Sequence, residues 1–182
     1  MLKIITAPDK ILAKKTENYI FKDKDRYLPR FLKGMEASLL SADDPKGVGL
    51  AAPQVGKSVS IFMAKPSEKS KISVFINPVM LDTKSRPKKN TKGREYRKLE
   101  GCLSLPNIWG EVVRADEIKL SYFDEKGKVH VEKFDGFMAT VIQHEIDHLV
   151  GILFPKRVLE QGGKLFKSRK ENGKDVFDEL EI

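Results

Sequence analysis

Residues 137–149 form the stretch that most constrains the fold of this chain. Apolar side chains recur there every three or four residues, which predicts an amphipathic helix: Phe137, Met138, Val141, Ile142 and Leu149. Asp135 is suited to cap the start of this helix, and Gly151 stands where a C-terminal stop is expected. The remaining chain must therefore supply elements that cover the apolar face of this helix.

The same helix carries His144 and His148, which are four residues apart and so share one face. Glu145 lies at the edge of that face. Two neutral imidazoles beside a carboxylate suit a metal that activates water, with the glutamate transferring the proton. The alternative is a core helix with two hydrogen-bonded histidines, and a metal site would still need a third ligand.

Length and composition indicate one globular domain over residues 1–182. The chain is 40% hydrophobic and 33% charged, and no apolar run approaches the roughly 20 residues of a membrane span. The N-terminus has no apolar signal region, so we expect a cytoplasmic protein with no membrane partner. Cys102 is the only cysteine, which excludes an internal disulfide and fits a reducing compartment.

The net charge of +8 is concentrated in two stretches. Residues 84–98 hold eight Lys or Arg against one acid, and residues 156–175 hold seven against three. Such runs are usually solvated loops, although a basic surface also suits an anionic partner such as RNA. We expect no DNA partner. Gly47-Val48-Gly49 lacks the third glycine and the preceding strand of a dinucleotide site, so nucleotide binding is excluded.

Several further elements are predicted from local patterns. A second helix is expected over 26–41, and short strands over 59–63, 72–76, 79–81, 112–114, 118–123 and 129–134. The stretch 84–98 is expected to be a loop or a bent hairpin. Asn172-Gly173 predicts a β-hairpin in the C-terminal extension, residues 163–182.

Three segments, taken together, resemble the motifs of peptide deformylases of the commoner bacterial type. They are Gly47 to Gln54, Glu100 to Ser104, and Gln143 to Leu149, in that order along the chain. The resemblance spans roughly residues 1 to 160. It implies an α+β fold in which antiparallel β-sheets pack around a central metal-binding helix.

By this resemblance Cys102 is the third metal ligand, beside His144 and His148. A thiolate and two imidazoles leave one coordination position open for water, as a catalytic site requires. The donor set allows Fe²⁺, Zn²⁺, Ni²⁺ or Co²⁺, and the family implies Fe²⁺ in the cell, with sensitivity to oxygen.

The reaction implied is removal of the formyl group from nascent polypeptides that begin with formyl-methionine. Glu145 would act as general base and then as general acid. The side chain of Gln54 and the backbone N–H of Leu103 would stabilise the oxyanion. The substrate would contact six residues, for several of which core packing is the alternative: Val48, Gly49, Gly101, Phe137, Thr140 and Val141.

Three further residues carry expectations. Glu100 and Arg114 resemble the structural ion pair of the family, although a weak surface pair is the alternative. His130 is expected at the surface and not as a ligand. The basic stretch 84–98 and a tail without a long helix depart from the family pattern, and leave ribosome association and oligomeric state open.

Two other functions compete with the deformylase. A metallopeptidase would take its third ligand from a downstream glutamate, of which there are four: Glu160, Glu171, Glu179 and Glu181. A non-enzymatic RNA- or ribosome-binding module would account for the basic stretches, but not for the three motifs.

Overall fold

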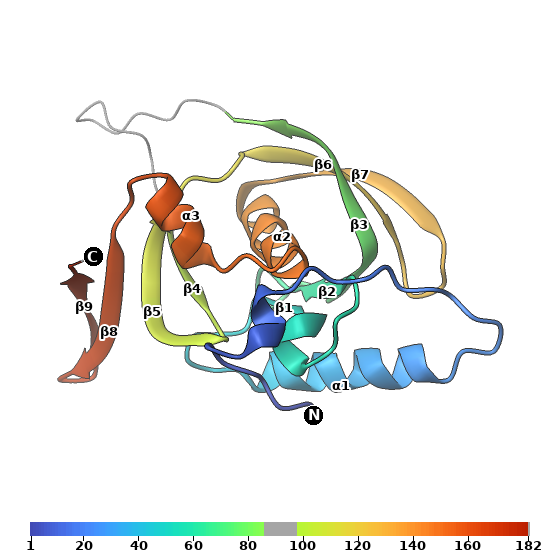
Figure 1. Cartoon of the computed structure of the whole chain (residues 1–182), viewed down its shortest axis with the longest axis horizontal. Coiled ribbons are helices and arrows are strands. Elements are labelled where there is room, and N and C mark those ends of the chain that lie inside the picture. Colours follow the sequence, from blue (N-terminus) through green and yellow to red (C-terminus); the bar gives the residue numbers. More distant parts are fainter. Residues whose placement is uncertain (86–97, 182) are drawn as a thin grey trace.

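Two antiparallel sheets and a central helix make up the computed structural model, which describes residues 1–85 and 98–181 (Figure 1). The expected α+β fold, with antiparallel sheets around the helix of residues 137–149, is confirmed. The loop or bent hairpin expected over 84–98 falls outside the described residues from 86 to 97. Within the described ranges, no helix is long and apolar enough to cross a membrane.

The larger sheet has five strands in the order β1-β2-β3-β6-β7, and all neighbours are antiparallel. Its strands are β1 (Gly49–Ala51), β2 (Ile61–Ala64), β3 (Ser73–Lys84), β6 (Glu117–Phe123) and β7 (Val129–Asp135). The two strands expected at 72–76 and 79–81 are one strand, so that prediction is wrong. Asn77 takes φ +50°, and the register shifts at this point without turning the chain back. Its side chain is held by both backbone polar groups of Tyr19.

The smaller sheet has the order β4-β5-β8-β9. Its strands are β4 (Lys98–Cys102), β5 (Leu105–Val112), β8 (Leu165–Glu171) and β9 (Lys174–Leu180). The strand expected at 112–114 instead ends at Val112, and both backbone polar groups of Val113 bond the side-chain amide of Gln161. In the C-terminal extension, β8 and β9 form a hairpin in which Asn172 and Gly173 both have positive φ.

Three α-helices cover these sheets: α1 (Tyr27–Ser41), α2 (Gly136–Leu149) and α3 (Phe154–Glu160). Two short 3-10 helices, η1 (Lys10–Ala13) and η2 (Ala52–Val55), complete the described elements. Asp135 stands at the N-cap of α2, as predicted, but its side chain makes no capping hydrogen bond. Gly151 takes φ +73° just after α2, and a Cβ there would lie 2.6 Å from the backbone of Ala13.

α2 lies between the two sheets (Figure 1). Its apolar face packs on the five-stranded sheet, where Ala139 and Ile142 join Phe62, Phe75 and Leu120 in one buried cluster. A second cluster lies between α1 and strands β1 and β2, and a third joins α3 to the smaller sheet. Because α2 is fixed by its apolar face, its polar residues are held toward β4.

Candidate active site

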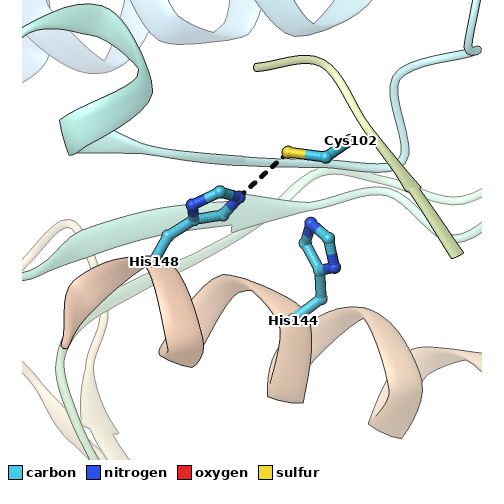
Figure 2. A group of neighbouring side chains, drawn as sticks. All are labelled: Cys102, His144 and His148. Atoms are coloured by element: carbon cyan, nitrogen blue, oxygen red, sulfur yellow. Dashed lines mark hydrogen bonds between the residues drawn. The ribbon is translucent and has the colours of Figure 1, made fainter. Parts of the chain in front are cut away.

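Cys102, His144 and His148 come together where the end of β4 approaches α2 (Figure 2). Both histidines project from α2, one turn apart, and Cys102 lies at the end of β4. One donor atom from each of the three residues lies within 4.8 Å of the others. The Cys102 Sγ is 3.2 Å from Nε2 of His148. The three predicted ligands are therefore close enough to share one ion.

The surroundings of these residues fit a metal. The ring of His148 is buried, and burial together with the neighbouring His144 lowers its pKa well below the usual value, so it is neutral. Glu145 Oε2 and His148 Nδ1 are buried and have no hydrogen-bond partner among the described residues. One sulfur and two nitrogen donors suit Zn²⁺, Fe²⁺, Co²⁺ or Ni²⁺.

Glu145 is buried directly beside the histidines. Burial raises the pKa of its carboxyl to about 7, and the charge of His144 opposes this only in part. Gly49 of β1 passes so close that a Cβ on it would lie 2.8 Å from Cδ of Glu145. The absence of a side chain at Gly49 therefore leaves the space that the carboxylate needs.

Gln54 faces the sulfur of Cys102 from η2. Its Oε1 accepts a hydrogen bond from Ala51 N at 2.8 Å, which fixes the amide so that Nε2 points toward the site. That Nε2 lies 3.5 Å from Cys102 Sγ and 3.2 Å from Ser104 Oγ. The side chain is buried, so its donor is held in position before any ligand arrives.

A short N-terminal segment, residues 5–7, connects the two loops that flank this sulfur. The N–H of Ile5 donates to the carbonyl of Gln54 at 2.8 Å, and the N–H of Ala7 donates to the carbonyl of Ser104 at 2.9 Å. We call this segment the N-terminal strap. It holds Gln54 and the turn after Cys102 in fixed positions relative to each other.

Behind the histidines, Glu100 and Arg114 form a buried ion pair, each with a 7% exposed side chain. The alternative of a weak surface pair is therefore wrong. Glu100 Oε2 also lies 3.0 Å from Nδ1 of His144, and Arg114 continues to Asp147, which binds Arg157. Burial alone would raise the pKa of Glu100, but hydrogen bonds from His144 and Arg114 lower it to about 2.

A cavity of about 490 Å³ opens beside these groups. Cys102, His144, Glu145, Gln54 and Leu103 all line it. The six residues expected to contact substrate line it as well: Val48, Gly49, Gly101, Phe137, Thr140 and Val141. Phe137 is half exposed at 50%, whereas Thr140 and Val141 are buried. The cavity is thus large enough for a side chain and continuous with the group of potential ligands.

Comparison with known proteins shows the family of this chain. A family model described as polypeptide deformylase matches residues 1–163. The chain belongs to the peptide deformylase family. It is a metal-dependent hydrolase that removes the N-formyl group of nascent polypeptides and releases formate.

The relatives and solved structures agree with this assignment. Peptide deformylase 1 of Bacillus cereus is 40% identical over 158 residues, which are 87% of this chain and 92% of that protein. A peptide deformylase of Christiangramia forsetii is 35% identical and covers 94% of this chain and 89% of its own length. The Met-Ala-Ser-bound crystal structure of a class I type b peptide deformylase from Acinetobacter baumannii is similar, with 30% identity and a TM-score of 0.75. That match covers 86% of this chain and 98% of the other.

Membership in this family excludes the metallopeptidase alternative. Among the described residues, the group that could hold a metal contains Cys102 and none of the downstream glutamates. His130 is not in this group either. It lies on β7 with Nε2 2.8 Å from Oδ2 of Asp124, partly exposed, as expected for a residue with no role as a ligand.

Lys98 and Trp109 are among the cavity-lining residues of this deformylase that sequence reasoning missed. Nζ of Lys98 donates to Oγ1 of Thr140 at 2.9 Å, which places a cation on the cavity wall beside α2. Trp109 lies on β5, opposite Gly101 in the ladder. The alternation of apolar and polar residues does not predict that Lys98 lines a cavity. The only sequence signal for Trp109 is that it is the single tryptophan in the chain.

Proposed function

We propose that this deformylase acts on formyl-methionine chains through a divalent metal held by Cys102, His144 and His148, and that the metal is Fe²⁺ in the cell. The mutual approach of the three donor atoms beside the buried Glu145 carries the proposal. A metal bound by such donors lowers the pKa of a coordinated water and polarises a carbonyl oxygen. Zn²⁺, Ni²⁺ or Co²⁺ can substitute, because the donors do not distinguish sharply among these ions.

Glu145 is the general base and then the general acid. Its carboxylate takes a proton from the attacking water as the new C–O bond forms on the formyl carbon. The same proton then goes to the amine nitrogen as the C–N bond breaks, which gives formate and a free N-terminus. Its pKa of about 7 supports both roles, because the group can gain and lose a proton near neutral pH.

Gln54 and Leu103 stabilise the negative charge that develops on the formyl oxygen. The buried amide of Gln54 is oriented by Ala51, so that its Nε2 faces the reacting centre. The backbone N–H of Leu103 is the second donor, and Leu103 follows the proposed ligand Cys102 directly. Donors fixed before the reaction cost no reorganisation in the transition state.

The methionine side chain occupies the cavity beside α2. Val48, Phe137 and Val141 supply apolar surface, and Thr140 supplies a hydroxyl. Gly49 and Gly101 also line the cavity and contact the peptide backbone there. The structure of the relative from Acinetobacter baumannii is described as Met-Ala-Ser-bound, and that tripeptide corresponds to a product of the proposed reaction.

The enzyme acts in the cytoplasm, where formylated chains emerge, and its basic surface associates with the ribosome. A net charge of +8 supports attraction to an RNA-rich partner. A fall in the affinity of the enzyme for ribosomes as the salt concentration rises would support this association.

Formate release from formyl-Met-Ala-Ser by anaerobic, Fe²⁺- or Ni²⁺-loaded enzyme tests the mechanism. We expect activity in the wild type and loss of activity in Glu145→Gln at unchanged metal content. Formate release by Glu145→Gln at the wild-type rate would remove Glu145 from its proposed role. No formate from wild-type protein holding one metal per chain would contradict the proposed use of this site.

A further inference from the structure

Trp109 lies at the boundary between the substrate cavity and the C-terminal hairpin. It lines the cavity and is directly opposite Gly101 in the ladder between β4 and β5. Paired residues in a ladder share one face of the sheet. Because Gly101 has no side chain, the indole ring covers its Cα, where a Cβ would lie 2.9 Å from the ring.

The hairpin of β8 and β9 holds this indole from the other side. Trp109 Nε1 donates to Oγ of Ser168 at 3.1 Å. The ring of Phe177 meets the indole edge-to-face, with centroids 5.7 Å apart and planes at 88°. Ser168 and Phe177 face each other in the hairpin, so two adjacent strands fix one side chain.

The two strands that hold the indole lie outside the part of the chain that matches the family model, which ends at residue 163. The other face of the smaller sheet is occupied by α3, since Gly110 of β5 and Leu165 of β8 pack against it. The hairpin therefore has two separate contacts: Leu165 joins the core, whereas Ser168 and Phe177 support a residue of the cavity wall.

We propose that the C-terminal hairpin is part of the peptide-binding site, and that it fixes Trp109 as an apolar platform for the substrate residues that follow methionine. This inference rests on the proposed placement of methionine in the cavity. An indole held on both sides offers a flat surface without loss of side-chain freedom on binding. It favours peptides with an apolar or aromatic residue shortly after the methionine. Ser168 and Phe177 are positioning residues, because they act through Trp109.

The single tryptophan gives a direct test. The intrinsic fluorescence of Ni²⁺-loaded enzyme is titrated with the tripeptide Met-Ala-Ser and, separately, with methionine amide. We expect the tripeptide to change the emission and methionine amide to leave it unchanged, because only the tripeptide reaches the indole. Equal changes with both, or no change at tripeptide concentrations that inhibit turnover, would overturn the proposal.

Kinetics of Phe177→Ala supply the second test. We expect KM for formyl-Met-Ala-Ser to rise about threefold to tenfold at unchanged kcat, since one aromatic contact to the indole is lost. KM for formyl-methionine amide should not change, and Phe177→Tyr, which keeps the ring, should restore the wild-type KM. Asp178→Asn removes an exposed ion pair with Arg169 in the same hairpin and serves as the matched control.

The outcomes separate this inference from the proposed function. An equal rise in KM for both substrates, or no rise for either, in Phe177→Ala with a wild-type melting temperature would overturn the role of the hairpin. If the wild type releases no formate, the proposed function fails, whereas the fluorescence titration still decides whether the indole contacts a bound peptide.

Discussion

Glu100 Oε2 lies 3.0 Å from Nδ1 of His144, so a buried carboxylate determines which ring nitrogen of this histidine remains for the site. The same carboxylate receives both Nε and Nη2 of Arg114. Glu100 is thereby fixed in orientation, and it fixes the imidazole in turn. A partner of this kind holds the ring orientation and makes the imidazole a better ligand.

Glu100→Gln should therefore weaken metal binding. We expect metal affinity to fall about 10- to 100-fold, because the amide cannot supply the negative charge that orients and polarises His144. Competition with a chromophoric chelator measures this affinity. Glu125→Gln, on an exposed turn, is the control that removes a carboxylate far from the site. Wild-type affinity in Glu100→Gln would show that the carboxylate does not support the ligand.

Metal removal should lower the stability of the whole protein. An ion that binds only the folded state adds about 4 kcal/mol when its free concentration is 1,000 times Kd. We expect the melting temperature of chelator-treated protein to rise on addition of Ni²⁺, and Cys102→Ser to abolish most of this rise. Equal rises in the two proteins would mean that the sulfur of Cys102 is not a ligand.

Gly49→Ala should reduce catalysis without loss of metal. The new methyl group would collide with the carboxylate of Glu145, and displacement of a reacting group by about 1 Å can cost about 10²-fold in rate. We expect kcat to fall by about this factor while metal content, measured by elemental analysis, stays at the wild-type level. A kcat within twofold of wild type would indicate that the carboxylate has room to move.

Lys98→Met should change the choice between similar substrates. The ammonium of Lys98, which binds Thr140 on the cavity wall, can also donate to the thioether sulfur of methionine but not to norleucine. We expect the preference for formyl-methionine over formyl-norleucine peptides, measured as kcat/KM, to fall about threefold, as for loss of one weak hydrogen bond.

Lys46→Met is the matched control for this comparison. Lys46 also lines the cavity, but its ammonium is paired with the carboxylate of Glu68. The same fall in both variants would indicate a general effect of charge and not a specific contact from Lys98.

Local patterns predicted the parts of the site that lie close together in sequence. The four-residue spacing of His144 and His148 predicted two side chains on one face, because a helix repeats on that scale. Cys102 could be added only through resemblance to a family, since no local rule joins β4 to α2. The single-domain organisation over 1–182 and the roles of individual residues stay predictions.

Long-range pairing explains what the sequence did not reveal. The position of Trp109 depends on the pairing of β5 with β8, two strands that lie far apart in the chain. β3 was divided in two because Asn77-Pro78 is typical of a turn, whereas tertiary hydrogen bonds to Tyr19 hold the asparagine within the strand. The burial of Glu100 and Arg114 likewise depends on packing and not on spacing.

The N-terminal strap has a consequence for heat inactivation. It joins the loop of Gln54 to the turn after Cys102 through single backbone hydrogen bonds from Ile5 and Ala7. Segments held by so few bonds open at lower free-energy cost than core strands do. On warming, we expect the loop of Gln54 and the turn after Cys102 to separate while the sheets are still intact. We therefore expect formate release to be lost on heating at a lower temperature than the one at which the circular dichroism of the sheets changes.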